Sequence, residues 1–83
     1  KEMESFVDRY KDNVMTKFGE AFPNLDNSDK RLFMYLVLGF LSRAISIFMN
    51  EKIEVVYNRK SRLKQKISRS NSQYKKIFAS LIR

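Results

Sequence analysis

The chain has 83 residues and a formal net charge of +8, from seventeen Lys and Arg against nine Asp and Glu. It contains no Cys, which excludes disulfide bonds and thiolate-held zinc, and no His, which removes the usual proton shuttle of enzymes. The longest apolar run, residues 32–41, is about half of the ~20 residues that a membrane-spanning helix needs. We therefore expect one small soluble domain that is not an enzyme and holds no metal or cofactor.

The positive charge is concentrated in the last third of the chain. Residues 55–83 hold nine basic and no acidic residues, whereas residues 1–54 hold eight basic and nine acidic ones. Such an asymmetry predicts a polyanionic partner, with nucleic acid first and an anionic membrane surface second. A basic face that only keeps the protein soluble is the alternative, and charge alone does not decide between them.

Residues 1–22 are predicted to form an amphipathic helix. Glu and Asp gather toward its start, where the helix dipole favours them, and Pro23 ends it. Apolar residues recur along it at helical spacing: Met3, Phe6, Val7, Tyr10, Val14, Phe18 and Phe22. This stripe indicates packing into a core rather than a ligand site.

A second helix is predicted over residues 28–38. It is apolar on almost every side, so we expect it to be the most buried helix of the domain. Gly39 supplies its stop. The residues at its start are all good N-cap residues: Asp26, Asn27 and Ser28.

A short third helix is predicted over residues 43–49, with Ser42 as its cap. Residues 50–52 then form the turn into a long helix that ends near residue 67. Two helices joined by so short a connection, the second one amphipathic and basic, are the outline of a helix-turn-helix. Four residues of the short helix are expected to face the core: Ala44, Ile45, Ile47 and Phe48.

The long helix, about residues 52–67, has two different faces at 100° per residue. One face can enter a core and holds Ile53, Val56, Lys60, Leu63 and Ile67. The stem of its lysine can lie along the core with the ammonium in solvent. The opposite face is polar and cationic, which fits a helix in the major groove of DNA, and it holds Glu54, Asn58, Arg62 and Gln65.

After a small polar linker that begins at residue 68, a terminal helix is predicted over residues 72–83. Its apolar residues are Tyr74, Ile77, Phe78, Leu81 and Ile82. They either cover the remaining apolar surface of the domain or pair with a second copy. No segment has the pattern of a strand pair. The elements together predict an all-α fold, a single domain over residues 1–83 that forms a small bundle of about five helices containing a helix-turn-helix.

Residues 25–67 carry a recognisable pattern, in which a glycine, an isoleucine and a valine precede an Asn, Arg and Leu ladder. These positions are Gly39, Ile45, Val56, Asn58, Arg62, Leu63 and Ile67. In this pattern the chain resembles the LuxR/GerE-type helix-turn-helix domain. The block YNRKSRLK, residues 57–64, is similar to a Bacteroidetes branch of that family, found at the C-terminus of regulators with tetratricopeptide repeats and a membrane-spanning segment.

The resemblance implies the DNA-binding output domain of a bacterial transcriptional regulator, with a recognition helix over about residues 52–67 in double-stranded DNA. Because the chain starts with Lys1 and shows no signal peptide, we expect it to be the C-terminal part of a longer protein that holds the sensing half. A cytoplasmic location follows, and anchoring of the whole protein in the inner membrane and pairing into a homodimer both remain open. No small-molecule substrate is expected for this part.

If the long helix enters the major groove, its outward residues have defined roles. Arg62 can bind guanine through two hydrogen bonds, and Asn58 or Gln65 can do the same for adenine. Glu54 repels phosphate, unless it accepts a hydrogen bond from cytosine or pairs with Asn58 or Arg62. The remaining candidates are expected to contact phosphates or flank the groove, with Tyr57 or Ser61 also able to meet a thymine methyl: Ser42, Arg43, Lys52, Tyr57, Arg59, Ser61, Lys64, Lys66 and Arg69.

Two other functions are open at this point. The first is a protein-interaction or dimerisation module that uses the terminal helix, residues 73–83, together with the basic face. The second is association with a membrane surface through the basic helix lying on anionic lipid.

Overall fold

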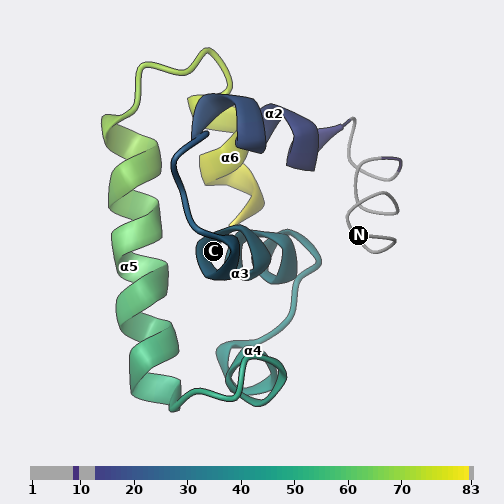
Figure 1. Cartoon of the computed structure of the whole chain (residues 1–83), viewed down its shortest axis with the longest axis vertical. Helices are drawn as coiled ribbons and strands as arrows, with labels where there is room; N and C mark the ends of the chain where they lie inside the picture. Colours follow the sequence, from purple (N-terminus) through teal and green to yellow (C-terminus); the bar gives the residue numbers. More distant parts are fainter. Residues whose placement is uncertain (1–8, 10–12, 83) are drawn as a thin grey trace.

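The computed structural model describes residue 9 and residues 13–82. This part of the chain contains five helices and no strand, which confirms the expected all-α fold (Figure 1). Among these helices, none combines the length and the hydrophobicity that crossing a membrane requires. The helices are α2 (Val14–Ala21), α3 (Asn27–Val37), α4 (Ser42–Phe48), α5 (Ile53–Arg69) and α6 (Lys75–Leu81).

Of the first predicted helix, residues 1–22, the structure describes Arg9, which is helical, and residues 13–22, which contain α2. Asn13 precedes it with a φ of 61°, a left-handed conformation that interrupts an α-helix, so the prediction of one unbroken helix is wrong. Val14 and Phe18 are buried as expected, and α2 ends before Pro23. Four residues of the predicted apolar stripe lie outside the described residues: Met3, Phe6, Val7 and Tyr10.

The most buried helix is α3, as the sequence predicts. It begins after Asp26, whose carboxylate accepts a hydrogen bond from the N–H of Asp29 at 2.9 Å, so Asp26 is the N-cap among the three candidates. Six consecutive residues, 32–37, are buried. Gly39 follows the helix with a φ of 85°, a conformation that glycine adopts without steric cost.

Three phenylalanines from α2, α3 and α6 form the centre of the core. Phe18 and Phe33 are stacked, with ring centroids 3.8 Å apart. Phe78 places its ring edge-on to both, at 5.4 and 5.6 Å. All three side chains are completely buried, which ties together helices far apart in the sequence.

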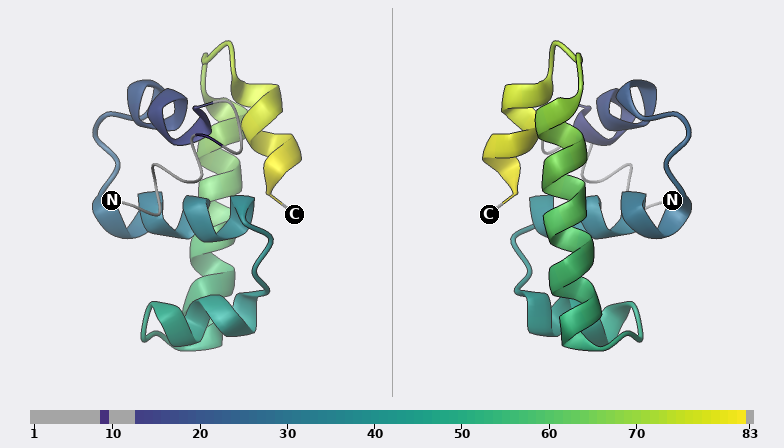
Figure 2. Two further views of the ribbon diagram at one scale, coloured as in Figure 1. Left: turned by 90° about the vertical axis from the view of Figure 1, so that its right-hand side faces the viewer. Right: turned by 90° about the vertical axis from the view of Figure 1, so that its left-hand side faces the viewer.

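The terminal helix α6 is shorter than the predicted range of residues 72–83. Phe78 and Ile82 are buried against the core, whereas Ile77 is 47% exposed. Both α2 and α6 lie above α3 in the two orientations of Figures 1 and 2. Of the two predicted roles for this helix, covering the domain's own apolar surface is the one that the structure shows.

The helix α4 exposes apolar residues that were expected to face inward. Ile45 is its only buried residue, while Ile47 is 72% exposed and Phe48 is 47% exposed, so the prediction for these two is wrong. A helix this short packs against α5 through one narrow face, which holds Ile45. Ile47 lies about 200° around the helix axis from Ile45 and therefore faces away from the core. Phe48 instead packs against the rings of Tyr35 and Phe40, with centroids 5.4 and 5.2 Å away.

The start of α4 also differs from the prediction. Leu41 is the N-cap residue, and Ser42 is the first residue of the helix, so its hydroxyl does not cap the helix. The hydroxyl that hydrogen bonds within this helix belongs to Ser46, which donates to the carbonyl of Arg43 at 2.6 Å.

Candidate nucleic-acid interface

The connection from α4 to α5 is a tight turn of four residues, 49–52. Asn50 has a φ of 54°, the left-handed conformation that Asn tolerates better than most residues. The N–H of Asn50 donates to the carbonyl of Ile47 at 3.2 Å, and the N–H of Glu51 donates to that of Ser46 at 2.9 Å. This pair of bonds is a Schellman motif, which fixes where the chain leaves α4 and therefore how α5 is aimed.

The helix α5 stands along one side of the domain, with α4 at its first residues and α6 near its far end (Figure 1). Its buried face holds Val56, Leu63 and Ile67, as predicted, and Ile53 is half-buried at its start. Lys52 is the N-cap residue and makes no side-chain capping bond. With 17 residues, the helix is about 25 Å long.

The opposite face of α5 is uncovered along its whole length (Figure 2, right). Asn58, Arg62 and Gln65 are exposed on it. Within the described residues, none of these three side chains makes a hydrogen bond or an ion pair, so their donors and acceptors are free for a ligand. The other exposed residues of this helix include Tyr57, Ser61, Lys64, Lys66 and Arg69.

The helix carries six basic residues and one acidic residue, Glu54. Glu54 is exposed in the first turn of α5, where the positive end of the helix dipole stabilises its carboxylate. No ion pair or hydrogen bond joins it to Asn58 or Arg62 in the described part of the chain, so the predicted intrahelical pairing is absent there.

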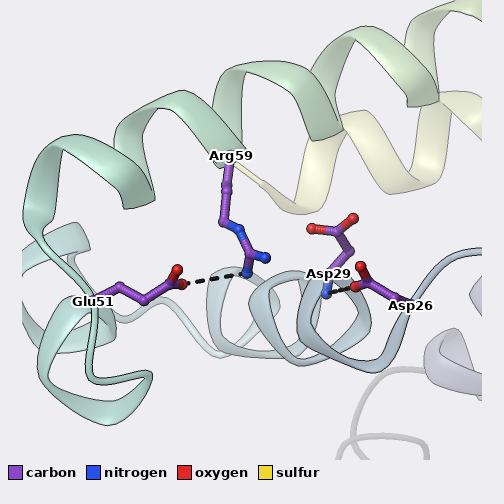
Figure 3. Close-up of polar contacts among 4 residues, drawn as sticks. All are labelled: Asp26, Asp29, Glu51 and Arg59. Atoms are coloured by element: carbon purple, nitrogen blue, oxygen red, sulfur yellow. Dashed lines mark hydrogen bonds and ion pairs between the residues drawn. The ribbon is translucent and has the colours of Figure 1, made fainter.

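One flank of α5 meets carboxylates from other elements. Arg59 points from α5 toward the turn before it, where its Nη1 lies 3.3 Å from Oε2 of Glu51 (Figure 3). This nitrogen is shielded from solvent and has no bond with hydrogen-bond geometry, so the contact is an ion pair. Arg59, predicted as a phosphate contact, is therefore engaged inside the protein and fastens the turn to α5.

Acidic residues continue along the same flank at the start of α3. Asp26 and Asp29 line a pocket of about 230 Å³ together with Arg62 and Lys66. Figure 3 shows the carboxylate of Asp29 on the side of Arg59, while the carboxylate of Asp26 is turned to the N–H of Asp29. The sequence explained these two residues only as helix-start residues, and nothing in their spacing indicated that they face the basic helix.

On the other flank of α5, the described residues show no ion pair with a carboxylate. Lys60 is half-buried, as the position of its stem on the core-facing side predicts. Its pKa is lowered from the ordinary value, first by burial of the ammonium and second by repulsion from Lys64 one turn along the helix. Lys60 shares a cavity with Ser42, which is half-buried at the start of α4.

Most of the residues predicted to contact DNA thus lie on α5, and a few lie on α4 or in the turn before α5. Arg43 is exposed on α4, and Lys52 is exposed at the start of α5. Arg69 is exposed at the last residue of α5, about 16 Å along the axis from Asn58. Within residue 9 and residues 13–82, no group of His, Cys, Asp or Glu is arranged to hold a metal ion.

Comparisons of the chain with protein-family models, with curated proteins and with solved structures gave no match. The resemblance to LuxR/GerE-type domains therefore rests on the residues of the chain itself and stays a prediction.

Proposed function

We propose that this chain is a DNA-binding domain that places α5 in the major groove of double-stranded DNA. The observation that carries the proposal is the outward face of α5, which is exposed over its length, cationic and without internal partners at Asn58, Arg62 and Gln65. The buried face holds the helix against the domain, so the outward face is presented on a rigid element.

The geometry of α5 suits direct contact with base edges. The major groove is about 12 Å wide and admits an α-helix. Asn58, Arg62 and Gln65 are spaced at i, i+4 and i+7, which places them on one face of the helix. Arginine can bind guanine through O6 and N7, and asparagine or glutamine can bind adenine through N6 and N7, each pair giving ~1–3 kcal/mol of discrimination.

Phosphate contacts would come from cations on either side of that face. Lys64, Lys66 and Arg69 are exposed on α5, and Lys52 and Arg43 are exposed at the start of α5 and on α4. Such contacts position a protein on the duplex without reading its sequence. Arg59 is left out of this set because it pairs with Glu51.

The alternative of a dimerisation module built on the terminal helix has less support. Phe78 and Ile82 are buried in the core, so α6 offers Ile77 as its one large exposed apolar residue within the described chain. A substitution of Phe78 by Asp would unfold the domain and could not test docking. We therefore favour DNA over a second copy on α6.

The test is fluorescence anisotropy of the chain on a labelled random 30-base-pair duplex and on an AT-rich promoter duplex. The affinity is expected to fall linearly with salt on logarithmic axes, with a slope of about −0.9 per neutralised phosphate. Arg62→Ala is expected to weaken binding by about 10-fold or more without loss of stability.

The matched control is Lys76→Ala, which removes an exposed cation from α6 at the same cost in net charge. It is expected to weaken binding much less than Arg62→Ala. Equal losses for the two variants would mean that net charge, rather than the outward face of α5, produces the binding. No binding even at low salt would overturn the proposal for this chain.

A further inference from the structure

A partly open cavity of about 470 Å³ lies between the end of α3, the loop after it, the middle of α5 and the end of α6. This volume lies in the range of small-molecule sites, which are mostly apolar with a few polar groups that orient the ligand. Nine described residues line the cavity and five of them are apolar, although the surface that they expose to it is slightly more polar than apolar: Leu36, Val37, Gly39, Phe40, Leu41, Ser42, Lys60, Ser80 and Leu81.

Among the described residues, Lys60 is the only charged one in this lining. No carboxylate among the described residues pairs with it, and its one charged neighbour, Lys64, repels it. The lining residues from α3, the loop, α4 and α6 carry no titratable side chain. The Lys60 side chain is half-buried in this hollow, and its ammonium is left without a paired carboxylate among the described residues that would offset its partial desolvation.

The hydroxyls of the cavity add a donor beside this cation. Ser42 makes no side-chain hydrogen bond within the described part of the chain, whereas the Ser80 hydroxyl donates to the carbonyl of Ile77 at 2.8 Å. One ammonium and one free hydroxyl suit a group with a single negative charge. The five apolar side chains of the lining can pack against a ligand with a hydrocarbon or aromatic body.

We propose that this cavity is a binding site for a small organic carboxylate. The carboxylate lies at the Lys60 ammonium and the Ser42 hydroxyl, and the apolar body packs against Leu36, Phe40 and Leu81. The site is separate from the outward face of α5 and does not depend on the proposed DNA binding.

A DNA phosphate is the other source of an anion, and the experiment separates the two. Isotope-labelled protein is titrated with octanoate, with octanol at the same concentrations, with inorganic phosphate and with an unlabelled duplex, each followed by NMR. Octanoate is expected to shift the amides of Gly39, Leu41 and Ser42 in a saturable way and to raise the pKa of Lys60, measured on its side-chain carbon signals. Octanol and inorganic phosphate are expected to bind at least 10-fold more weakly.

The titrations of the unmodified protein can overturn the proposal without any variant. Equal binding of octanol and octanoate would show an apolar hollow with no role for the cation. Shifts of the cavity residues with the duplex, but none with octanoate at millimolar concentration, would assign Lys60 to the DNA backbone.

The variant that sharpens the result is Lys60→Met, which keeps the length of the apolar stem and removes the charge. It is expected to lose at least 10-fold in octanoate affinity, while Lys76→Gln on α6 leaves that affinity unchanged. Thermal unfolding followed by circular dichroism establishes that both variants are folded. Retained octanoate affinity in folded Lys60→Met would overturn the proposal.

Discussion

The two long faces of α5 have opposite relations to the rest of the molecule. Val56, Leu63 and Ile67 are at most 3% exposed and join α5 to the core. Asn58 and Arg62, on the other side, are exposed, and their side chains make no hydrogen bond or ion pair with the described chain. Residues that hold the fold and residues proposed to bind DNA thus alternate along one helix, so single substitutions should separate stability from binding.

The two flanks of the same helix also differ. Arg59 meets Glu51, and Asp26 lies in the pocket beside Arg62, so acidic groups from other elements weaken the positive potential on that flank. On the flank of Lys60, no acidic residue of the described chain pairs with the lysine or lines its cavity. A charge pattern that is evenly basic in the sequence becomes uneven in space because the carboxylates come from the turn and from the start of α3.

The largest effect is expected from the buried face. Leu63→Ala removes a side chain that is 3% exposed and leaves a cavity, which should lower the free energy of unfolding by ~2–5 kcal/mol. Urea unfolding followed by circular dichroism measures this loss. The exposed neighbour gives the control, since Ser61→Ala should change stability by less than ~0.5 kcal/mol. Near-equal stability of the two variants would contradict the assignment of the two faces.

A smaller effect, with opposite signs for stability and for binding, is expected at Asp26. Asp26→Ala removes the N-cap bond to the Asp29 N–H and should lower the stability by ~1 kcal/mol. It also removes a carboxylate from the pocket that Arg62 and Lys66 line, so the affinity for DNA should rise at low salt.

The matched variant is Asp26→Asn, because asparagine caps a helix about as well as aspartate. It should keep most of the stability and show the same rise in DNA affinity as Asp26→Ala. Unfolding and anisotropy on the same two proteins measure both quantities. If the affinity rises in Asp26→Ala alone, loosening of α3 rather than charge is the cause.

The sequence predicted the faces of α5 well because 17 residues repeat the helical period several times. The prediction failed on α4 because seven residues repeat the helical period too few times to show which apolar side chains face inward. Ile47 and Phe48, predicted to face the core, are exposed. The interruption at Asn13 was also missed. An asparagine tolerates the left-handed conformation, but no pattern around it demands one.

The sequence predicted which face of α5 forms the candidate interface. It did not predict which side chains on that helix are paired within the protein. Arg59 is paired with Glu51, eight residues earlier, and this contact depends on the turn at Asn50 rather than on helical spacing. The approach of Asp26 to the basic flank depends in the same way on how α3 packs against α5. Such pairs need tertiary packing, which a single sequence does not encode as a local pattern.

The smallest effect is expected at Glu54, the one acidic residue on the outward side of α5. Its carboxylate has no partner among the described residues, so in the groove it faces phosphates. Glu54→Gln should raise the affinity for a random duplex by roughly two- to five-fold at low salt, and salt should reduce this gain because it screens an exposed charge. Glu20→Gln, on the exposed surface of α2, is the charge-matched control and should have a much smaller effect.

The same variant distinguishes two roles for Glu54. A carboxylate can accept a hydrogen bond from the amino group of cytosine, so a residue that reads a base would lose preference for duplexes with a cytosine at one position when changed to glutamine. A residue that only repels phosphate would gain affinity equally on all duplexes. Anisotropy on a panel of duplexes that differ at single base pairs separates these results. A loss of affinity on every duplex would mean that Glu54 helps to position α5 and does not face the DNA.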